Sequence, residues 1–462
     1  MKTQKNTSTS GKLHSCRFIL AALAAMTGAA LHAAVPEISG VTMAQASDRL
    51  VTIAYTLADA PAVVTVDVQT NVTGDVWSSI GGEAVWNAMG DVWKRVETGN
   101  HTITWRPDHS WPDHKIADGG ARAVVTAWAL DNTPDYMVVD LAATNTVRYY
   151  PAVDFLPGSE LGQTGTVTNN PAYKTSQLLM RKIMARGVEW TMGSASGETQ
   201  RNATRETAHK VTLANNYYIG VFEITQSQWK NIATNSTTTI HFSVEGAMRP
   251  MERVCYNEIR NAANTTTANT SYDWPNDPNP LSFLGLLRSK TGLDFDLPTE
   301  AQWEFAARAG HGSGYWNDGA AVMNADTDAD LAKLGRYKGD NPGGTSTTAT
   351  LAPSEGGTAI VGSYTPSDWG LYDMHGNMWE LCLDWYEDNL TAHGGAVNIN
   401  PATPTQTLSG ASGTTRVMRG GSWGNAAGSC RPAYRSYNTP SSRNTNDGFY
   451  AGFRVLCSAG LR

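Results

Sequence analysis

The chain has 462 residues, of which 17% are charged, and its formal net charge is −7. It is rich in residues that pack or turn, with 15 Trp, 17 Tyr and 44 Gly. This composition excludes an intrinsically disordered chain and indicates a loop-rich globular protein with aromatic packing. An acidic chain without a basic stripe also argues against a nucleic-acid-binding protein.

The N-terminus has the features of a secretory signal peptide. Four basic residues lie within the first 17, an apolar run follows over residues 18–31, and Ala33 and Ala34 are small. We therefore expect residues 1–34 to be a signal peptide cleaved near Ala33 or Ala34. The run is too short for a comfortable membrane span, so no transmembrane segment is expected after cleavage. Cleavage removes four basic and no acidic residues, which takes the net charge to −11. The signal peptide predicts a secreted, periplasmic or cell-surface protein.

Residues 36–150 are predicted to form a small all-β domain. β-branched and aromatic runs are separated by Asp, Gly, Asn and Pro clusters, and they lie at 51–57, 62–68, 101–105 and 123–130. This strand-and-turn spacing is typical of a β-sandwich of the immunoglobulin or fibronectin kind. Residues 151–177 contain Pro, Gly, Thr and Asn and are interpreted as a linker.

A second domain is predicted over residues 178–462, with both strands and helices. Strands are expected over 182–193 and 210–225, and a helix is expected to begin at Thr225. Residues 281–291 have helical periodicity. Thr299 and Gln302 have the spacing of a capping box, which predicts another helix start.

The stretch from 416 to 454 is dominated by Arg, Gly, Asn and aromatic residues. It has too little apolar content to offset the cost of ordering its own backbone, about 1–2 kcal/mol per residue. Its arginines are suited to fixing carboxylates and carbonyls. We therefore expect an irregular surface, braced by hydrogen bonds, on a framework made by the residues before it.

Six phrases in the second domain occur together in the order of a known family. They are GVEWTMG, YYIGVFEIT, LPTEAQWEFAARAG, GLYDMHGNMWE, RGGSW, and RSYNTP followed by GFRV. The chain resembles the formylglycine-generating enzyme, or sulfatase-modifying factor, family over roughly residues 178–457. The resemblance implies an α+β fold related to the C-type lectin fold, with little regular secondary structure and bound calcium. In active members it implies a copper(I) site of two cysteines that oxidises a sulfatase cysteine to formylglycine.

The residues that match the oxidase site depart from the family pattern. Ser422 matches the substrate-site serine and Cys430 the second cysteine, but Asn425 stands where the first cysteine is expected. One thiolate cannot make a two-sulfur copper(I) site. We therefore expect a non-oxidase variant whose 416–454 stretch binds a ligand. The alternative is a formylglycine-generating oxidase with Cys430 and Ser422 at its site, and copper is expected only in that case.

By the same resemblance, Asp373, Gly376, Met378 and Glu380 match the positions that hold a structural calcium. Two carboxylates and two backbone carbonyls are suitable hard ligands for that ion. The alternative is that Asp373 and Glu380 pair with arginines of the 416–454 stretch. His375 is isolated in the sequence and is expected to be a packing or surface residue.

Four cysteines follow the signal peptide, and an exported protein permits disulfides between them. Cys430 has three interpretations: half of a disulfide, a buried inert thiol, or a reactive thiol. Of these we favour a disulfide between Cys382 and Cys430.

Aromatic and amide side chains of the second domain have two interpretations. They would line a groove for a protein, peptide or carbohydrate ligand, or they would be core residues. The candidates are Trp379, Trp423, Asn425, Tyr434, Tyr437 and Tyr450.

Overall fold

The computed structural model describes most of the chain after the predicted signal peptide. The described residues are 34–117, 119–142, 147–158, 166–234, 246–261, 270–312, 329–338, 357–388, 414–443 and 451–460. Residues 1–33 lie outside them, and so does Tyr450. Residues from Val35 to Arg462 form one compact unit.

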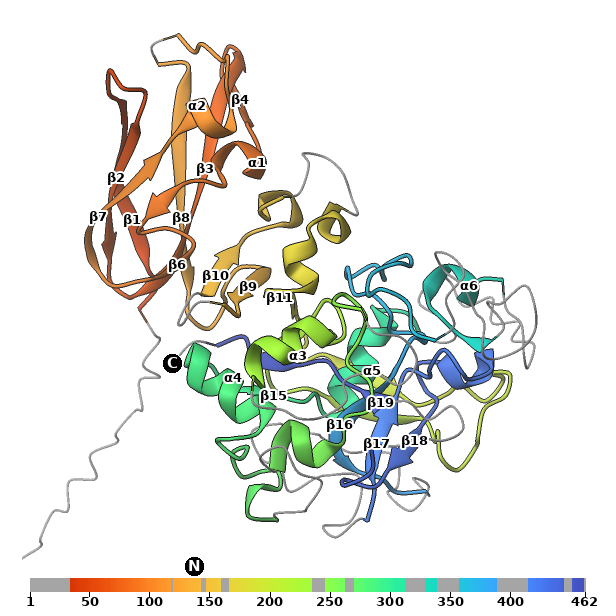
Figure 1. Ribbon diagram of the computed structural model, residues 1–462. Helices are drawn as coiled ribbons and strands as arrows, with labels where there is room; N and C mark the ends of the chain where they lie inside the picture. Colours follow the sequence, from red (N-terminus) through yellow and green to blue (C-terminus); the bar gives the residue numbers. More distant parts are fainter. Residues whose placement is uncertain are drawn as a thin grey trace, which may run out of the picture. The chain divides into compact units, whose positions relative to one another are not determined.

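The first eight strands form two antiparallel sheets, with two helical turns between strands (Figure 1). One sheet has the order β1-β2-β7-β5, and in the other β3 pairs with β4, β6 and β8. The elements are β1 Glu37–Gln45, β2 Val51–Ala58, β3 Ala62–Thr73, β4 Val76–Ser79, α1 Gly82–Val85, β5 Met89–Gly90, β6 Lys94–Val96, β7 Gly99–Trp105, α2 Pro107–Ser110 and β8 Ala121–Ala129. All four strands predicted here are strands in the structure. Side chains alternate along β2 between buried and more exposed, as a sheet with one covered face requires.

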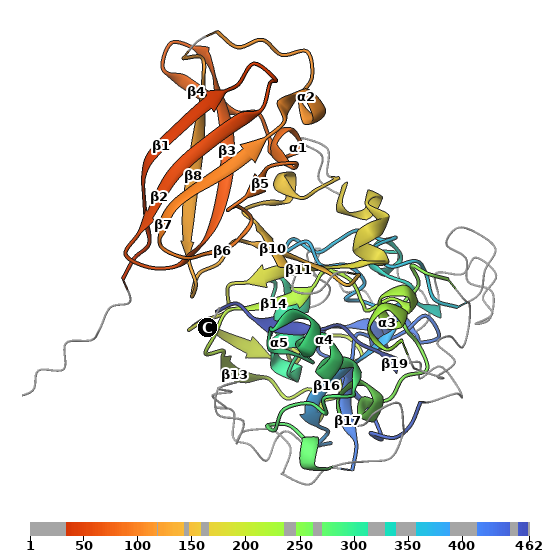
Figure 2. The ribbon, with the colours of Figure 1, turned by 60° about the vertical axis from the view of Figure 1, so that its left-hand side comes forward.

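Figure 2 shows β1, β2 and β7 side by side, in a layer separate from β3 and β8. Buried residues from both layers belong to one apolar cluster, among them Ile53, Val64, Val66 and Ile103.

A six-stranded sheet joins residues on both sides of position 150. Its order is β10-β9-β11-β14-β20-β15. The strands are β9 Tyr136–Asp140, β10 Val147–Tyr150, β11 Gln177–Ile183, β14 Tyr217–Gly220, β15 Phe295–Asp296 and β20 Leu456–Ser458. Thr133 adds a side-chain link, because its hydroxyl donates to the carbonyl of Ala459 over 2.9 Å. β9 and β10 therefore belong to the same sheet as strands of the second domain.

The segment expected to be a linker contributes side chains to the core. It holds the short 3-10 helices η1 Val153–Phe155, η2 Thr166–Asn169 and η3 Pro171–Lys174. Leu156, Val167 and Tyr173 are buried in the cluster that also contains the N-terminal strands. The described part of 151–177 is packed rather than extended.

Both helix starts predicted from capping residues are confirmed. Helix α3 spans Gln226–Ile232 and is capped by Thr225 with Gln228, and α5 spans Glu300–Arg308 and is capped by Thr299 with Gln302. Helix α4, Phe283–Thr291, lies within the predicted helical range and begins after Ser282. The remaining elements of this region are β12 Glu189–Met192, β13 His209–Thr212, η4 Asn257–Asn261, η5 Thr270–Tyr272 and α6 Leu331–Leu334.

The two long strands predicted in the second domain are each divided. The range 182–193 contains the end of β11 and all of β12, and 210–225 contains most of β13 and all of β14. Aromatic packing holds the helices on the core: Trp229 of α3 stacks on Phe283 of α4 with ring centroids 4.9 Å apart, and Phe453 meets both edge-on. The expected mixture of helices and sheets is confirmed.

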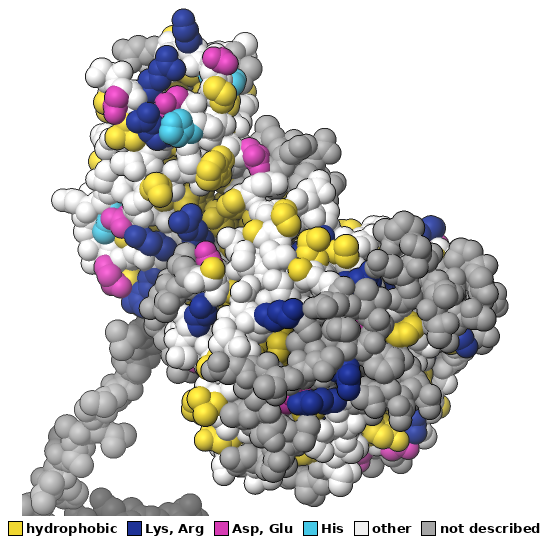
Figure 3. Space-filling model, in the orientation of Figure 1, with side chains coloured by type: hydrophobic (Ala, Val, Ile, Leu, Met, Phe, Trp, Pro, Cys, Tyr) yellow, Lys and Arg dark blue, Asp and Glu magenta, His cyan; other side chains and the backbone are white. Residues whose placement is uncertain are grey.

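On the face in Figure 3, Lys and Arg side chains of the described residues are interspersed with Asp and Glu. Across the described ranges, we find no helix that combines the length and apolarity needed to span a bilayer.

Candidate functional site

The 416–454 stretch is organised by a small sheet with the order β18-β17-β16-β19. Its strands are β16 Trp379–Trp385, β17 Arg416–Arg419, β18 Ser436–Asn438 and β19 Ala451–Gly452. β16 pairs antiparallel with β17 and parallel with β19, and nearly every residue of β16 and β17 is buried. The segment between β17 and β18, which carries Ser422, Asn425 and Cys430, is therefore fixed at both ends.

The arginines of this stretch are internal braces, whereas we expected a braced surface. Four of them are almost fully buried and each pairs with a buried glutamate. The pairs are Arg419 with Glu304, Arg431 with Glu206 (2.8 and 2.9 Å), Arg435 with Glu300 (2.6 and 2.9 Å) and Arg454 with Glu380 (2.6 and 2.5 Å). Removing one partner of such a pair typically costs about 3–5 kcal/mol, because the other charge stays buried alone. The stretch thus ties the sheet to helix α5 and to residues near 200.

The residues that match the oxidase site lie together. The Ser422 hydroxyl donates a hydrogen bond to Asn425 Oδ1 over 2.5 Å, and the Asn425 N–H donates to the Ser422 carbonyl over 2.9 Å. Cys430 lies at the end of the 3-10 helix η8, Ala427–Cys430, and is fully buried. Burial raises the pKa of its thiol, so this thiol keeps its proton at neutral pH.

The two glycines before Ser422 explain how the thiol is covered. Gly420 and Gly421 both have positive φ, at +93° and +77°. A Cβ on Gly421 would lie 2.6 Å from Cys430 Sγ. Only glycine allows this backbone to close over the thiol.

The predicted Cys382–Cys430 disulfide is not formed. All four described cysteines, Cys255, Cys382, Cys430 and Cys457, are buried free thiols. Cys382 lies on the central strand β16 and packs in the cluster that holds Trp303, whereas Cys430 packs with Leu331, Leu334 and Tyr337. The structure agrees with the interpretation of Cys430 as a buried thiol.

The aromatic candidates that the structure describes lie in different environments. Trp379 is 1% exposed and belongs to the core, where its ring lies 5.9 Å from that of the half-buried Tyr434. Trp423 is also buried and packs with Met378. Tyr437 is exposed, and its ring lies 4.5 Å from that of Tyr386.

The loop from 371 to 380 holds a group of buried carboxyls. Gly362 N–H donates to Asp373 Oδ2 over 2.7 Å, while Asp373 Oδ1 is buried and has no hydrogen-bond partner among the described residues. Burial raises the pKa of Asp373 to about 6. Glu380 is fully engaged, since both its oxygens accept from Arg454 and one also accepts from the Trp303 indole over 2.7 Å.

Glu223 belongs to this group and was missed in the sequence. It accepts hydrogen bonds from the Asn377 amide over 2.6 Å and from the Met378 N–H over 3.0 Å. Burial, followed by the charges of Asp373 and Glu380, raises its pKa well above the ordinary value. Its one sequence signal is an acidic residue inside the apolar phrase YYIGVFEIT.

His375 is a packing residue, as expected. It is fully buried, its Nδ1 lies 3.2 Å from the Cys430 carbonyl, and burial lowers its pKa to about 4. The imidazole is therefore neutral near pH 7.

The sequence profile described as "Sulfatase-modifying factor enzyme 1-like domain" matches residues 170–459, more than half of the chain. The chain belongs to this family. A formylglycine-generating enzyme of Thermomonospora curvata is 35% identical over 158 residues, which are 33% of this chain and 47% of that protein. The chaperone protein LppX of Paenibacillus barcinonensis is 24% identical over 238 residues, 48% of this chain and 75% of its own length. The solved structure of PvdO from Pseudomonas aeruginosa has 21% identity and a TM-score of 0.45, covering 61% of this chain and 94% of that one.

The match with the Thermomonospora enzyme spans about half of that relative's length. Family membership carries the C-type-lectin-like fold for the second domain. The resemblance to the family also raises the question of whether residues 371–380 could hold a calcium ion.

The residues matched to the calcium positions differ in what they could offer to that ion. Asp373 offers a buried oxygen without a partner, as a ligand would, and calcium accepts such hard oxygens. Glu380 does not fit, because Arg454 holds both of its oxygens. Within the described ranges, no three acidic, histidine or cysteine side chains converge as a metal site. Calcium here would depend on Asp373 and on the backbone carbonyls of Gly376 and Met378.

Proposed function

We propose that this chain is an exported member of the sulfatase-modifying factor family that lacks the oxidase activity and acts by binding a ligand. The supporting observation is the hydrogen bond between Ser422 and Asn425, which occupies the two positions matched to the substrate-site serine and the first cysteine. An amide is a poor ligand for copper(I), which prefers thiolates. The remaining thiol, Cys430, is buried and holds its proton, whereas metal binding needs it deprotonated.

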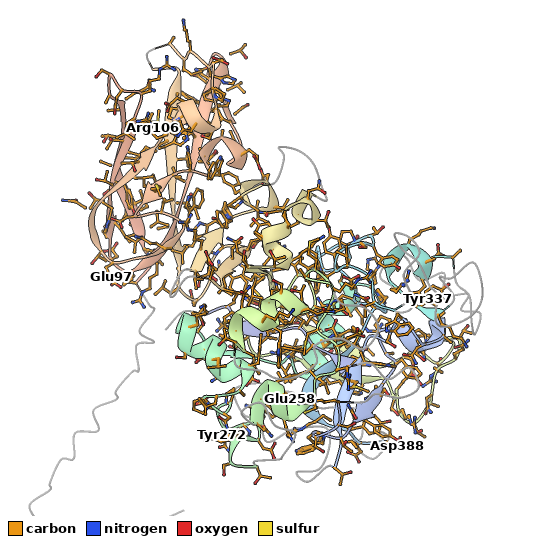
Figure 4. All side chains as sticks on the ribbon, in the orientation of Figure 1. Glu97, Arg106, Glu258, Tyr272, Tyr337 and Asp388 are labelled. Atoms are coloured by element: carbon orange, nitrogen blue, oxygen red, sulfur yellow. The ribbon has the colours of Figure 1, made fainter. Side chains whose placement is uncertain are left out.

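The exposed part of the 416–454 stretch supports a protein or peptide as the ligand. The Tyr437 ring is tilted by 39° against that of Tyr386, whose hydroxyl donates to Asp388 over 2.9 Å. Asp388 is labelled in Figure 4; it is exposed and pairs with Arg205 over 2.6 Å. Exposed aromatic rings beside charges of both signs are common at protein interfaces, where Tyr and Arg are enriched. A carbohydrate on this face is the alternative ligand.

A copper(I) titration beside a peptide-oxidation assay tests the loss of oxidase chemistry. The wild-type protein is expected to bind copper(I) only weakly and to leave a Cys-x-Pro-x-Arg peptide unoxidised. The informative variant is Asn425→Cys, which supplies a second thiol, with Asn425→Ser as its matched control. Copper-dependent turnover by the wild type that is lost in Cys430→Ala would contradict the proposal and restore the oxidase alternative.

Tyr437→Ala tests the binding face. Peptides selected from a random library on the wild-type protein are expected to bind this variant at least tenfold more weakly. Thr439→Ala, a substitution of an exposed residue, is the control and should leave binding within twofold. Selected peptides that bind both variants equally would place the peptide site elsewhere.

Calcium is proposed as a structural ion held by Asp373 with the carbonyls of Gly376 and Met378. Dialysed protein is expected to retain about one calcium per chain, and a chelator is expected to lower the melting temperature, because an ion bound only to the folded state stabilises it. Elemental analysis and thermal melts check both. Asp373→Asn should lose the ion and Asp388→Asn, an exposed control, should keep it. A calcium-free wild type whose melting is unchanged by the chelator would refute the site.

A further inference from the structure

A cavity of about 230 Å³ is lined by none of the residues matched to the oxidase site. It is lined by β9, β11 and the turn at 366–372, with Val153 and Val167 from the segment between the two strands. Tyr136, Val153 and Val167 precede the residues that match the family profile, which begins at 170. The cavity is therefore a feature of how this chain builds β9 and its following segment onto the family domain.

Three aromatic rings form walls of the cavity: those of Tyr136, Trp369 and Tyr372. Each ring is held in place. The Tyr372 ring lies 5.2 Å from that of Phe222, the Trp369 ring lies 5.2 Å from that of Phe305, and the Arg181 guanidinium lies 4.9 Å from the Tyr136 ring. Such fixed rings offer apolar faces without further cost in side-chain ordering.

The polar tips of these rings have no protein partner in the described part of the chain. No hydrogen bond joins the hydroxyls of Tyr136 and Tyr372 or the indole N–H of Trp369 to any described residue. The Tyr136 hydroxyl lies against Gly370, where a Cβ would be 3.5 Å from it. Two hydroxyls and one N–H at the cavity can therefore bond to water or to a molecule that replaces it.

The charged residues of the cavity are already paired. Arg181 makes an ion pair of 3.0 Å with Asp135, and Asp368 lies 2.9 Å from His311 Nε2. A ligand with a net charge would have to compete with these partners. The cavity favours a neutral ligand with several hydroxyl groups.

We propose that this cavity binds a single neutral pyranose ring, as a free monosaccharide or as the end of a glycan. Its volume is below the roughly 300–1,000 Å³ of sites for drug-sized ligands, so it admits one ring and not a chain of rings. The C–H faces of a sugar pack on the aromatic walls, and its hydroxyls pair with the three polar tips. An aromatic side chain of a peptide would fill the same volume but leave those tips unpaired, which is costly.

Saturation-transfer NMR on the full chain tests the proposal with glucose, galactose, mannose and N-acetylglucosamine, and with N-acetyltyrosinamide as the competing aromatic ligand. At least one sugar is expected to bind in the millimolar range, and N-acetyltyrosinamide is expected not to displace it. Methyl glycosides distinguish the two sources, because a site for the end of a glycan accepts them and a site for the free reducing sugar does not.

Variants that remove one polar tip each locate the binding. Tyr136→Phe and Trp369→Phe keep a ring in the wall and are expected to weaken sugar binding roughly fivefold or more, the cost of one lost hydrogen bond. Trp86→Phe, at an exposed ring that does not line the cavity, is the matched control and should change binding less than twofold. Thermal melts confirm that each variant is folded. The proposal is overturned if no sugar binds, if both cavity variants bind like wild type, or if N-acetyltyrosinamide binds in place of the sugar.

Discussion

Asp384, at the end of β16, accepts a hydrogen bond from the backbone N–H of Glu300 over 2.6 Å. Burial, with the charge of Glu300 as the second cause, raises the pKa of Asp384 to about 6. The pKa of the Asp384 carboxyl is lower in the unfolded state. As the pH rises, the unfolded state therefore releases this proton before the folded state does. The stabilisation is present below about pH 4 and is lost as the pH rises through about 6.

Asp384→Asn should remove this pH dependence, because an amide does not titrate. Between pH 4 and 7, the wild-type free energy of unfolding is expected to fall relative to that of the variant by up to roughly 3 kcal/mol. Urea unfolding at several pH values measures both curves. Parallel curves for the two proteins would mean that Asp384 has an ordinary pKa in the folded state.

The cysteines allow a second test at the residue scale. Four buried free thiols predict that the mature protein, unfolded in denaturant without reductant, takes up four alkylating groups. In the native state, alkylation should be slow at all four sites because each thiol is buried. Intact-mass spectrometry counts the groups. A count of two would indicate one disulfide, and peptide mapping would then show whether it joins Cys382 to Cys430.

The partners and the burial of the arginines could not be predicted from the residues alone. Arg435 was expected to fix carboxylates, and it does, but its partner Glu300 lies 135 positions away in the sequence. Nothing local indicates such a pairing. A run of Arg, Gly and Asn indicates a surface, so the burial of Arg416, Arg419 and Arg435 was not predictable from composition.

At the scale of elements, α5 depends on its N-terminal cap. Thr299 accepts a hydrogen bond from the Gln302 N–H over 3.2 Å, and the Gln302 side chain accepts from the Thr299 N–H over 2.9 Å. Thr299→Ala removes the first of these bonds and should cost about 1 kcal/mol. Thr299→Ser keeps the hydroxyl and is the control. Chemical denaturation compares them, and equal losses in both variants would show that the methyl group, rather than the cap, matters.

The same elements show what local sequence can predict. Helices α3 and α5 were found because a Thr and a Gln three residues apart mark their starts. The strands β15 and β19 have two residues each, too few for any periodicity. Their pairing depends on partners far away: β15 pairs with β20, and β19 pairs in parallel with β16. Ser422, Asn425 and Cys430 could be assigned to motif positions because the phrases occur in order, whereas Glu223 was missed because no motif position was assigned to it.

At the scale of the molecule, the start of the second domain depends on β9 and β10, which share a sheet with its strands. β9 pairs with β11 along five residue positions, and Met137, Val139 and Tyr149 are buried in the same cluster as Trp229 and Phe453. A fragment that starts at residue 170, where the family profile starts, would leave the edge of β11 unpaired and this apolar surface exposed. Unpaired edge strands with apolar faces favour aggregation.

We therefore predict that a fragment of residues 131–460 is more soluble and melts at a higher temperature than a fragment of residues 170–460. Both fragments lack the sheets formed by β1 to β8, so the comparison isolates the contribution of β9, β10 and the residues up to 169. Size-exclusion chromatography and thermal melts measure the difference. If the shorter fragment is monomeric and equally stable, β11 is a self-sufficient edge, and the domain starts near 170 rather than at 131. If only the longer fragment is stable, β9 and β10 are part of the second domain, and the cavity beside Tyr136 is formed in that fragment as well.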